Sequence, residues 1–526
     1  MLRIFITCVS LLLSFSAWAQ NAYININILN GSVPNYRYYE QNSPLKIEMI
    51  NGVFKFDEPT QSYTTTLAFN LASPRTINLT YVGVKSLKGN SRRHRFFLSP
   101  GDSISLKVDM KKAETDIEIN GKGAANNYSL DFKNIETQKN YGDSLPDKVI
   151  AIFNKMYRDN KRILADYIKT HEPDNQFIQA HNLDLQYSTV LNFYYFKENN
   201  KYRLGDKYER FQPAWERAQD SLFKTVSYRL IDPEKTGGKL NALKQPLSTI
   251  SNDEALISDN YQELIKHFMR REIESLANEA QTNPEQFFRQ WYNADINTGR
   301  EAYSNGGTNL LKEKIVNTYF TGKTADFMYA CLITDALYEI DPKSIVSIFD
   351  RYKKLFPKSN YANSFQTQVD EIANREAKKL NEKMIFAFAN GTTMKTLDEV
   401  LWLTKGKTIL VYMWGTWNAP SRSELEKHSA AIRAHFKDKD LTYLYIANYD
   451  LKNEAGWKKQ IAYFQLEGLH ILADDDLNKD IMTKVKGKEY PTYFIIKKDG
   501  SYELAKAGYP MKREVLIEQL ETAMAN

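Results

Sequence analysis

Asn418 and Ser421 stand three residues apart, where the continuous apolar run Thr408–Trp414 gives way to a predicted helix. A helix N-terminus stabilises negative charge through its unpaired N–H groups and its macrodipole, so a nucleophile held there is activated. An amide does not ionise, and the Ser421 hydroxyl needs a base before it can act as a nucleophile. The nearest candidate base, His428, lies about 10 Å farther along a helix. We therefore expect no nucleophilic catalysis here, and we expect His428 to be a half-buried face residue.

The same residue types are also those that begin a helix. Asn418 is among the best N-cap residues, and Pro420 is tolerated in a first helical turn. Ser421 followed by Glu424 fits a capping box. One interpretation of this segment is therefore an ordinary helix start without further function.

Few other side chains have the types and spacing of a reactive or metal-binding site. Cys331 lies in an apolar helical pattern, which predicts a buried and inert thiol. The run 474–476 is Asp-Asp-Asp, but it lacks the ordered oxygen ligands of a calcium loop, so we expect a solvated loop after a strand. The seven histidines form no zinc-binding pattern, and residues 121–123 lack the third glycine of a dinucleotide-binding loop. The sequence thus predicts no metal site and no cofactor.

Two further clusters could contact a ligand or a partner. The densest basic cluster is Arg92–Arg95, which we expect at a solvated hairpin edge, with contact to an anionic glycan or a lipid headgroup as the alternative. Phe193–Phe196 is a run of four aromatic residues that would point around most of a helix, so we expect core and an inter-domain contact rather than sugar stacking. The chain has 70 Lys and Arg against 64 Asp and Glu, a net charge of +6. This small excess argues against a dedicated nucleic-acid binder.

The elements that would position Asn418 alternate between strand and helix from about Lys383 onward. The run Thr408–Trp414 predicts a strand buried on both faces, and 421–436 predicts a helix with one apolar face. The other expected elements are strands 384–389, 441–449, 469–473, 493–496 and 502–507, helices 397–404, 455–464 and 512–524, and a hairpin turn at 499–500. This order predicts an α/β sheet with parallel and antiparallel parts.

The preceding residues predict two different kinds of structure. From Tyr23 to about Asn120, alternating runs separated by turn signals predict a small antiparallel sandwich or barrel of six to eight strands. From about Asn126 to Lys379, apolar spacings of three and four predict helices. The expected fold class is therefore multidomain α+β, and 526 residues are enough for about three domains. The predicted domains are a β-sandwich-like domain at 20–120, an α-helical domain at 121–382 and an α/β domain at 383–526.

Residues 1–19 have the features of a secretory signal peptide. A single arginine precedes an apolar run over 4–15, and 17–19 form a small-x-small cleavage pattern. Cleavage would remove Cys8 and leave Cys331 as the single cysteine, so no intramolecular disulfide could form. No later apolar run reaches about 18 residues. We therefore expect a protein exported to the periplasm or cell envelope, with no membrane span after cleavage.

Residues 411–424 resemble the active-site stretch of the TlpA/ResA-like thioredoxin family, whose usual pattern is F-W-A-T-W-C-x-P-C-R-x-E. The matching residues are Trp414, Thr416, Trp417, Pro420, Arg422 and Glu424. The segment 490–494 resembles the cis-proline loop of the same family. The resemblance covers 383–526, about a quarter of the chain, and implies a thioredoxin-like fold there. The segment 96–102, together with the β-then-helical order, also resembles multidomain thioredoxin-like proteins exported by Bacteroidetes.

The chain departs from this family at both redox positions, since Asn418 replaces the nucleophilic cysteine and Ser421 the resolving one. Disulfide exchange requires a thiolate to attack and a second thiol to resolve the mixed disulfide. Dithiol chemistry at this site is therefore excluded by the residues present. The resemblance still implies a groove that accepts an extended chain. Its expected lining residues are Trp414, Trp417, Asn418, Pro420, Ser421, Tyr490, Pro491 and Thr492.

We therefore expect an exported thioredoxin-fold protein that binds a peptide or an envelope protein through this groove without redox catalysis, and that is not an enzyme. One alternative is an oxidoreductase-family protein that acts through another residue, or through a partner's cysteine. The second alternative is a purely structural envelope scaffold, in which the segment after Trp417 is only a helix start.

Overall fold

The computed structural model describes residues 20–30, 35–41, 43–46, 49–82, 91–112, 117–133, 146–204, 210–215, 217–218, 251–338, 343–387 and 394–525. The predicted signal peptide lies outside these residues. The chain is a mixed α/β protein with several sheets, and it divides into two compact units. The first unit lies within 1–304 and 310–332, and the second within 305–309 and 333–526. The predicted division into three domains stays a prediction. No helix in the described ranges is long and apolar enough to cross a membrane.

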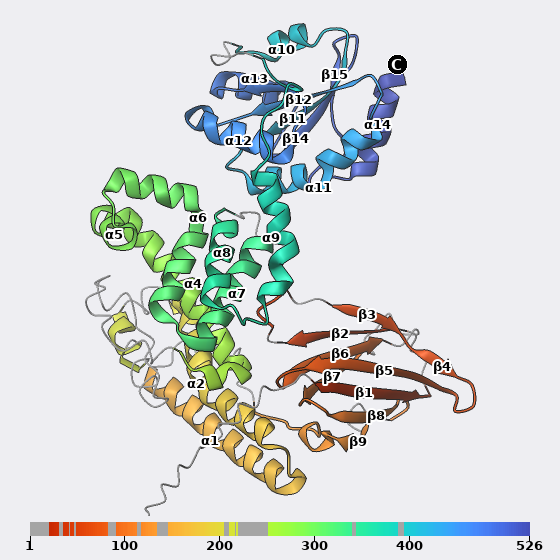
Figure 1. Cartoon of the computed structure of the whole chain (residues 1–526), viewed down its shortest axis with the longest axis vertical. Coiled ribbons are helices and arrows are strands. Elements are labelled where there is room, and N and C mark those ends of the chain that lie inside the picture. Colours follow the sequence, from red (N-terminus) through yellow and green to blue (C-terminus); the bar gives the residue numbers. More distant parts are fainter. Residues whose placement is uncertain are drawn as a thin grey trace, which may run out of the picture. The chain divides into compact units, whose positions relative to one another are not determined.

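The first unit begins with two β-sheets that enclose one apolar core (Figure 1). Its strands are β1 (Gln20–Leu29), β2 (Asn35–Gln41), β3 (Ile50–Val53), β4 (Lys55–Asp57), β5 (Ser62–Leu71), β6 (Arg75–Val82), β7 (Ser91–Leu98), β8 (Ser103–Asp109) and β9 (Ile117–Lys122). The strand orders are β4-β5-β1-β8-β9 and β3-β2-β6-β7. The described residues thus contain nine strands, so the prediction of six to eight antiparallel strands was wrong. It also missed the parallel pairing of β1 with β8, which arises because the chain visits the second sheet before it returns beside β1.

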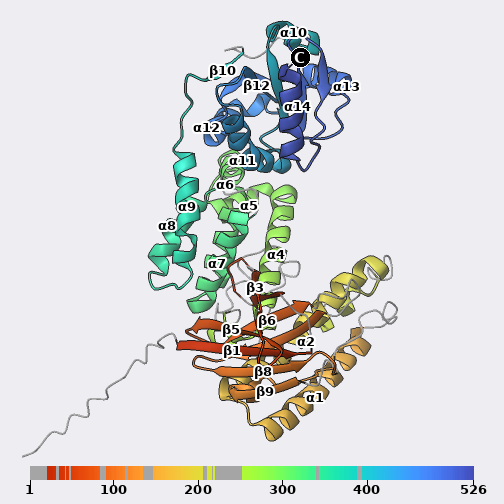
Figure 2. The same ribbon diagram turned by 90° about the vertical axis from the view of Figure 1, so that its right-hand side faces the viewer.

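Helices follow the sandwich, and the first two are long neighbours, α1 (Pro146–His171) and α2 (Asn175–Leu204) (Figure 2). They pack against Phe97 of β7 through Leu164 and Phe177. The remaining helices before the last sheet are α4 (Asp259–Thr282), α5 (Pro284–Tyr292), α6 (Ile296–Tyr319), α7 (Gly322–Tyr338), α8 (Ile345–Leu355) and α9 (Ala362–Glu376). Cys331 is buried in α7, as predicted. The aromatic run in α2 is largely core, because only Tyr195 of its four side chains is more than slightly exposed.

The second unit contains a six-stranded sheet of order β10-β13-β12-β11-β14-β15. Its elements are β10 (Met384–Phe386), α10 (Leu397–Leu403), β11 (Thr408–Trp414), α11 (Ala419–His435), β12 (Leu441–Ala447), α12 (Glu454–Phe464), β13 (Gly468–Leu472), α13 (Asp475–Lys484), β14 (Thr492–Ile496), β15 (Tyr502–Leu504) and α14 (Arg513–Ala525). The central strand β11 pairs in parallel with β12 and antiparallel with β14. The predicted mixture of parallel and antiparallel pairing in 383–526 is therefore confirmed.

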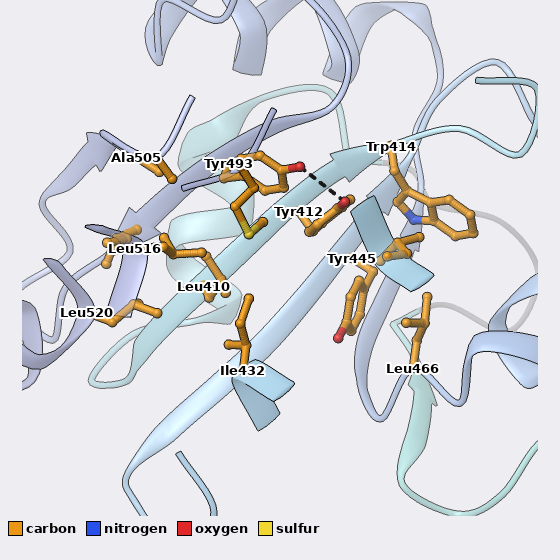
Figure 3. Close-up of a cluster of buried hydrophobic side chains, with 14 of the residues drawn as sticks. Leu410, Tyr412, Trp414, Ile432, Tyr445, Leu466, Tyr493, Ala505, Leu516 and Leu520 are labelled. Atoms are coloured by element: carbon orange, nitrogen blue, oxygen red, sulfur yellow. Dashed lines mark hydrogen bonds between the residues drawn. The ribbon is translucent and has the colours of Figure 1, made fainter. Parts of the chain in front are cut away.

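Every residue of β11 is buried, because helices cover both faces of the sheet. Ile409, Val411 and Met413 pack with residues of α10 and α13. Leu410 and Trp414 point to the opposite face and pack with residues of α11, α12 and α14 (Figure 3). This alternation follows from the two-residue period of a strand. It explains why a continuous apolar run was the correct signal for a central strand.

The run Asp474–Asp476 starts a helix, and the prediction of a solvated loop was wrong. The Asp474 carboxylate accepts a hydrogen bond from the Leu477 N–H at 3.0 Å and caps α13. Lys395 forms ion pairs with Asp474 and Asp476. An aspartate after a strand is also a favourable N-cap, and acidic residues in a first turn interact well with the helix dipole. Within the described ranges, no group of three or more His, Cys, Asp or Glu side chains could hold a metal ion.

The stability of the second unit is expected to fall below neutral pH because of His470 in β13. Its side chain is 1% exposed, and its Nε2–H donates to the Leu466 carbonyl at 2.8 Å. Its Nδ1 is buried and has no hydrogen-bond partner in the described part of the chain. Burial lowers the pKa of His470 from 6.5 to about 4. The unfolded chain therefore binds a proton first, and stability is lost as pH falls from about 6.5 to about 4, by at most about 3 kcal/mol.

The measurement is the urea midpoint of residues 20–526 at pH 7.5 and pH 4.5, beside that of His470→Phe. The phenyl ring preserves the ring contact with Tyr445, whose centroid lies 5.2 Å away, but cannot titrate. We expect the difference between the two pH values to be smaller in the variant, whatever its absolute stability. An unchanged difference would show that His470 does not carry this pH dependence.

Candidate functional site

The site is built where β11 ends and α11 begins. Asn418 is the N-cap of α11, and its side-chain oxygen accepts hydrogen bonds from the Ser421 N–H at 2.8 Å and from the Ser421 hydroxyl at 2.7 Å. Pro420 lies in the first helical turn. The predicted N-cap and the predicted place of the proline are therefore confirmed.

The predicted capping box of Ser421 and Glu424 was wrong. Because Asn418 caps α11, Ser421 is already its third residue and is completely buried. Glu424 is 2% exposed and points into the core, where it accepts from the Met511 N–H at 2.9 Å and from the Tyr493 hydroxyl at 3.4 Å. It therefore ties α11 to the segment before α14, rather than satisfying the first turn of its own helix.

Ser421 has no base beside it among the described residues. Its hydroxyl donates to the Asn418 amide oxygen, and its carbonyl accepts a hydrogen bond from Tyr412 at 3.4 Å. The Nε2 of His428 lies 3.7 Å from the Glu424 carboxylate, and its side chain is 19% exposed, in agreement with the predicted half-buried face position. The hydroxyl is therefore a structural donor and not an activated nucleophile.

Three aromatic side chains gather at this end of the sheet, and we call Trp417, Tyr449 and Tyr490 the aromatic cluster. The Trp417 ring centroid lies 5.9 Å from that of Tyr449 and 6.1 Å from that of Tyr490, both edge-on. The indole N–H donates to the Asn448 carbonyl at 3.1 Å. A Cβ on Gly415 would lie 2.3 Å from the indole nitrogen, so only glycine lets the ring lie against the backbone there. Trp417 is therefore held in place, although its side chain is 51% exposed.

The loop before β14 supplies the third ring. The Tyr490–Pro491 peptide bond is cis. The Tyr490 hydroxyl donates to the Asn478 side-chain oxygen at 2.5 Å, which links the loop to α13. Burial raises the pKa of Tyr490, so its hydroxyl stays a neutral donor at physiological pH. Tyr490 thus presents a half-buried ring that is held from both ends.

The structure brings only part of the predicted groove to the surface. Trp414 is completely buried in the core shown in Figure 3, so its inclusion among the groove residues was wrong. A match to a sequence pattern does not distinguish a strand residue that packs inward from a loop residue that lies outside. Ser421, Pro491 and Thr492 are buried as well. The predicted residues that retain exposed surface are Trp417, Asn418, Pro420 and Tyr490.

Sequence reasoning missed Tyr449 and Asp450, which follow β12. Tyr449 is 60% exposed, whereas Asp450 is 2% exposed and accepts from the Thr416 N–H at 2.8 Å and from its hydroxyl. Burial raises the pKa of Asp450, and the hydrogen bonds from Thr416 oppose that shift. These two residues could have been found from the strand pairing. Because β11 and β12 are parallel neighbours, they end at the same edge of the sheet, and residues 448–450 must lie beside 415–417.

The groups assembled here can form hydrogen bonds and apolar contacts, but they cannot exchange electrons. The amide of Asn418 and the hydroxyl of Ser421 occupy the helix tip, and the rings of the aromatic cluster lie beside it. The two cysteines of the sequence are Cys8 and Cys331, and neither falls within the ranges of the second unit. Thiol–disulfide exchange by residues of this unit is therefore excluded.

No model of a protein family matches the chain, and no curated protein matches it. Solved structures that match a small part of it are thioredoxin-fold proteins described as thiol-disulfide or disulfide oxidoreductases and thioredoxins. The thioredoxin domain of a thiol-disulfide oxidoreductase from Bacteroides vulgatus is 22% identical, over 24% of this chain and 84% of that one, with a TM-score of 0.20. A secreted disulfide oxidoreductase from Mycobacterium tuberculosis is 14% identical over 23% and 85%, with a TM-score of 0.19. An exposed lipoprotein thioredoxin from Streptococcus pneumoniae is 21% identical over 23% and 89%, with a TM-score of 0.18.

Proposed function

We propose that the chain is exported and that its second unit binds an extended peptide, or an extended segment of an envelope protein, at the aromatic cluster without redox catalysis. The observation that carries this proposal is the exposure of Trp417 and Tyr449, at 51% and 60%, on rings whose positions are held by neighbouring groups. Most large apolar side chains of this sheet are buried, so these rings are exceptions to the pattern around them.

The way Trp417 is held supports a binding role. Its N–H already has a backbone partner in Asn448, and its ring is packed edge-on against Tyr449 and Tyr490. A side chain that is fixed before binding loses little conformational entropy when a ligand covers it. Tryptophan and tyrosine also provide large contact areas, and they are enriched where interfaces contribute most to affinity. The aromatic cluster is therefore suited to hold an apolar side chain of a bound segment.

The helix tip supports binding without chemistry. Asn418 uses its side-chain oxygen to cap α11 and to accept from Ser421. These two side chains therefore satisfy each other and leave no nucleophile for a substrate. A ligand at the cluster would be held and released unchanged.

The test measures binding of a fluorescein-labelled, reduced and carboxymethylated casein, an extended chain without reactive thiols, to the mature chain by fluorescence anisotropy. Trp417→Ala is expected to weaken binding at least about tenfold, as for a central aromatic contact. Trp402→Ala is the matched control, because Trp402 in α10 is 79% exposed and is not part of the cluster. We expect the control to bind as the unaltered chain does.

Two results would contradict the proposal. If the unaltered chain does not bind the extended probe, the second unit is better described as a scaffold. If both tryptophan variants bind equally well, the contact lies elsewhere.

A further inference from the structure

A cleft of about 780 Å³, which we call the β7 cleft, lies in the first unit, whereas the aromatic cluster belongs to the second. It is bounded by β7, the segment 126–133, α2 and the N-terminal end of α4. Its volume falls within the range of about 300–1,000 Å³ that small-molecule sites occupy. The cleft includes Arg93 and Arg95 of the basic cluster, which nothing in the proposed function uses.

The alternation of β7 divides its side chains between two faces. Phe96 and Leu98 enter the sandwich core, so Arg93, Arg95 and Phe97 share the opposite face, toward the helices. Arg95 forms an ion pair with Asp259 at the start of α4. Arg93 is exposed and forms no ion pair with any residue of the described chain. A guanidinium with no acidic partner at the edge of a cleft is suited to a carboxylate, which it can bind through two parallel hydrogen bonds.

One wall of the cleft is aromatic. The centroids of Phe97 and Phe177 lie 5.5 Å apart, and the His181 ring stacks on Phe177 at 3.9 Å. The ring of Phe132 lies 6.1 Å from that of His181. Phe97 and Phe177 meet edge-on and are buried, so the rings of this wall that retain exposed surface are those of Phe132 and His181. The C–H face of a sugar ring can lie against an exposed aromatic ring such as Phe132.

His181 adds a directed acceptor to this wall. Its Nδ1 lies 3.0 Å from the Phe177 carbonyl, which can only accept, so Nδ1 carries the proton. Burial lowers the pKa of His181, so the ring is neutral and its Nε2 presents a lone pair. That nitrogen has no hydrogen-bond partner in the part of the chain that the structure describes, and it is not among the fully buried unpaired atoms. It is therefore available to a ligand's hydroxyl group.

Farther along α2, the lining of the cleft supplies more acceptors. Asp184 uses one carboxylate oxygen to accept from the Ser258 hydroxyl at 2.6 Å and from the Asn260 N–H at 3.2 Å. Its second oxygen, and the side-chain amide of Asn192, make no hydrogen bond within the described ranges. Burial and the nearby Asp184 raise the pKa of Asp259 to about 7. Arg95 compensates the charge of Asp259. The second oxygen of Asp184 can accept a hydrogen bond from a hydroxyl group of a ligand.

We propose that the β7 cleft binds an acidic sugar, a mono- or disaccharide of the uronic acid class. Its carboxylate pairs with Arg93, its hydroxyl groups donate to His181, Asp184 and Asn192, and one face of the ring lies on Phe132. The assignment is independent of the aromatic cluster, because all of these residues belong to the first unit.

Isothermal titration calorimetry of the mature chain with D-galacturonate and digalacturonate tests the proposal. We expect saturable binding of at least one of them, and binding of galactose at least about tenfold weaker, since galactose lacks the carboxylate. Arg93→Ala is expected to reduce the affinity for the acidic sugar at least about tenfold. This exposed change should not disturb folding. Arg300→Ala, another exposed arginine that does not line the cleft, is the matched control and should bind normally.

Three outcomes would overturn the proposal. The first is the absence of binding by either uronate, and the second is equal affinity for galactose. The third is tighter binding of glycylglycine, which would assign the cleft to a zwitterionic peptide instead. Asn192→Ala provides a second variant inside the cleft, and unchanged uronate affinity in both Arg93→Ala and Asn192→Ala would place the sugar elsewhere.

Discussion

Replacing both Asn418 and Ser421 by cysteine is expected to give the chain a thiol–disulfide activity that the unaltered chain lacks. The two side chains already meet through the 2.7 Å hydrogen bond from the Ser421 hydroxyl to the Asn418 amide oxygen. They stand at the N-terminus of α11, a helix of 17 residues whose dipole favours a thiolate at its first positions. The double variant therefore regains an attacking thiolate and a resolving thiol in contact with each other.

The measurement is dithiothreitol-driven reduction of insulin by residues 20–526 carrying Cys331→Ala, so that no other thiol of the chain contributes. We expect Asn418→Cys with Ser421→Cys to exceed the Cys331→Ala background at least about tenfold. Asn418→Cys alone should turn over more slowly than the double variant, because its mixed disulfide with insulin has no second thiol of the chain beside it and is resolved by dithiothreitol alone. Equal rates in the double variant and its background would show that the helix tip no longer presents a thiol to substrate. A rate in the Cys331→Ala background above that of dithiothreitol alone would contradict the exclusion of redox chemistry.

The local chemistry of the helix tip was predictable from sequence, because it depends on neighbouring residues. The central strand followed from a continuous apolar run, and the N-cap followed from Asn418 before Pro420. The wrong predictions concern segments whose residues fit two different local structures. Ser421 and Glu424 fit a capping box, but Asn418 caps the helix first and Glu424 is buried against Met511 instead. An aspartate such as Asp474 is common both in a loop and at an N-cap, and here it is the N-cap because α13 begins directly after it.

The features that could not be predicted from the sequence depend on contacts between residues far apart in the chain. The sequence around Arg93 does not show that β7 faces α2 and α4, because those helices begin more than 80 residues after Arg93. The pairing of Arg95 with Asp259 is equally invisible in sequence. Tyr449 is different, since the parallel pairing of β11 and β12 would have brought it beside Trp417 once the sheet order was known. The sequence alone thus indicates the helix tip, while the rest of the site depends on how the strands pair.

Trp414→Ala and Trp417→Ala are expected to separate core from binding surface. Trp414 is completely buried among residues of α11, α12 and neighbouring strands, so truncation leaves a large cavity and destabilises the second unit by about 3–5 kcal/mol. Trp417 is half exposed, so its truncation should change stability by less than about 1 kcal/mol while it weakens peptide binding. The Trp414 indole N–H has no hydrogen-bond partner among the residues that the structure describes, so Trp414→Phe should retain more stability than the alanine variant.

Hydrogen exchange of the β11 amides, followed by mass spectrometry on residues 20–526, measures this difference in stability locally. We expect much faster exchange in Trp414→Ala, an intermediate rate in Trp414→Phe and nearly unchanged exchange in Trp417→Ala. Because a core residue and a surface residue lie only three positions apart, one chain supplies both the variant and its control. If Trp414→Ala left β11 protected and removed binding of the extended probe, the Trp414 indole would line the binding surface, contrary to its burial in the core.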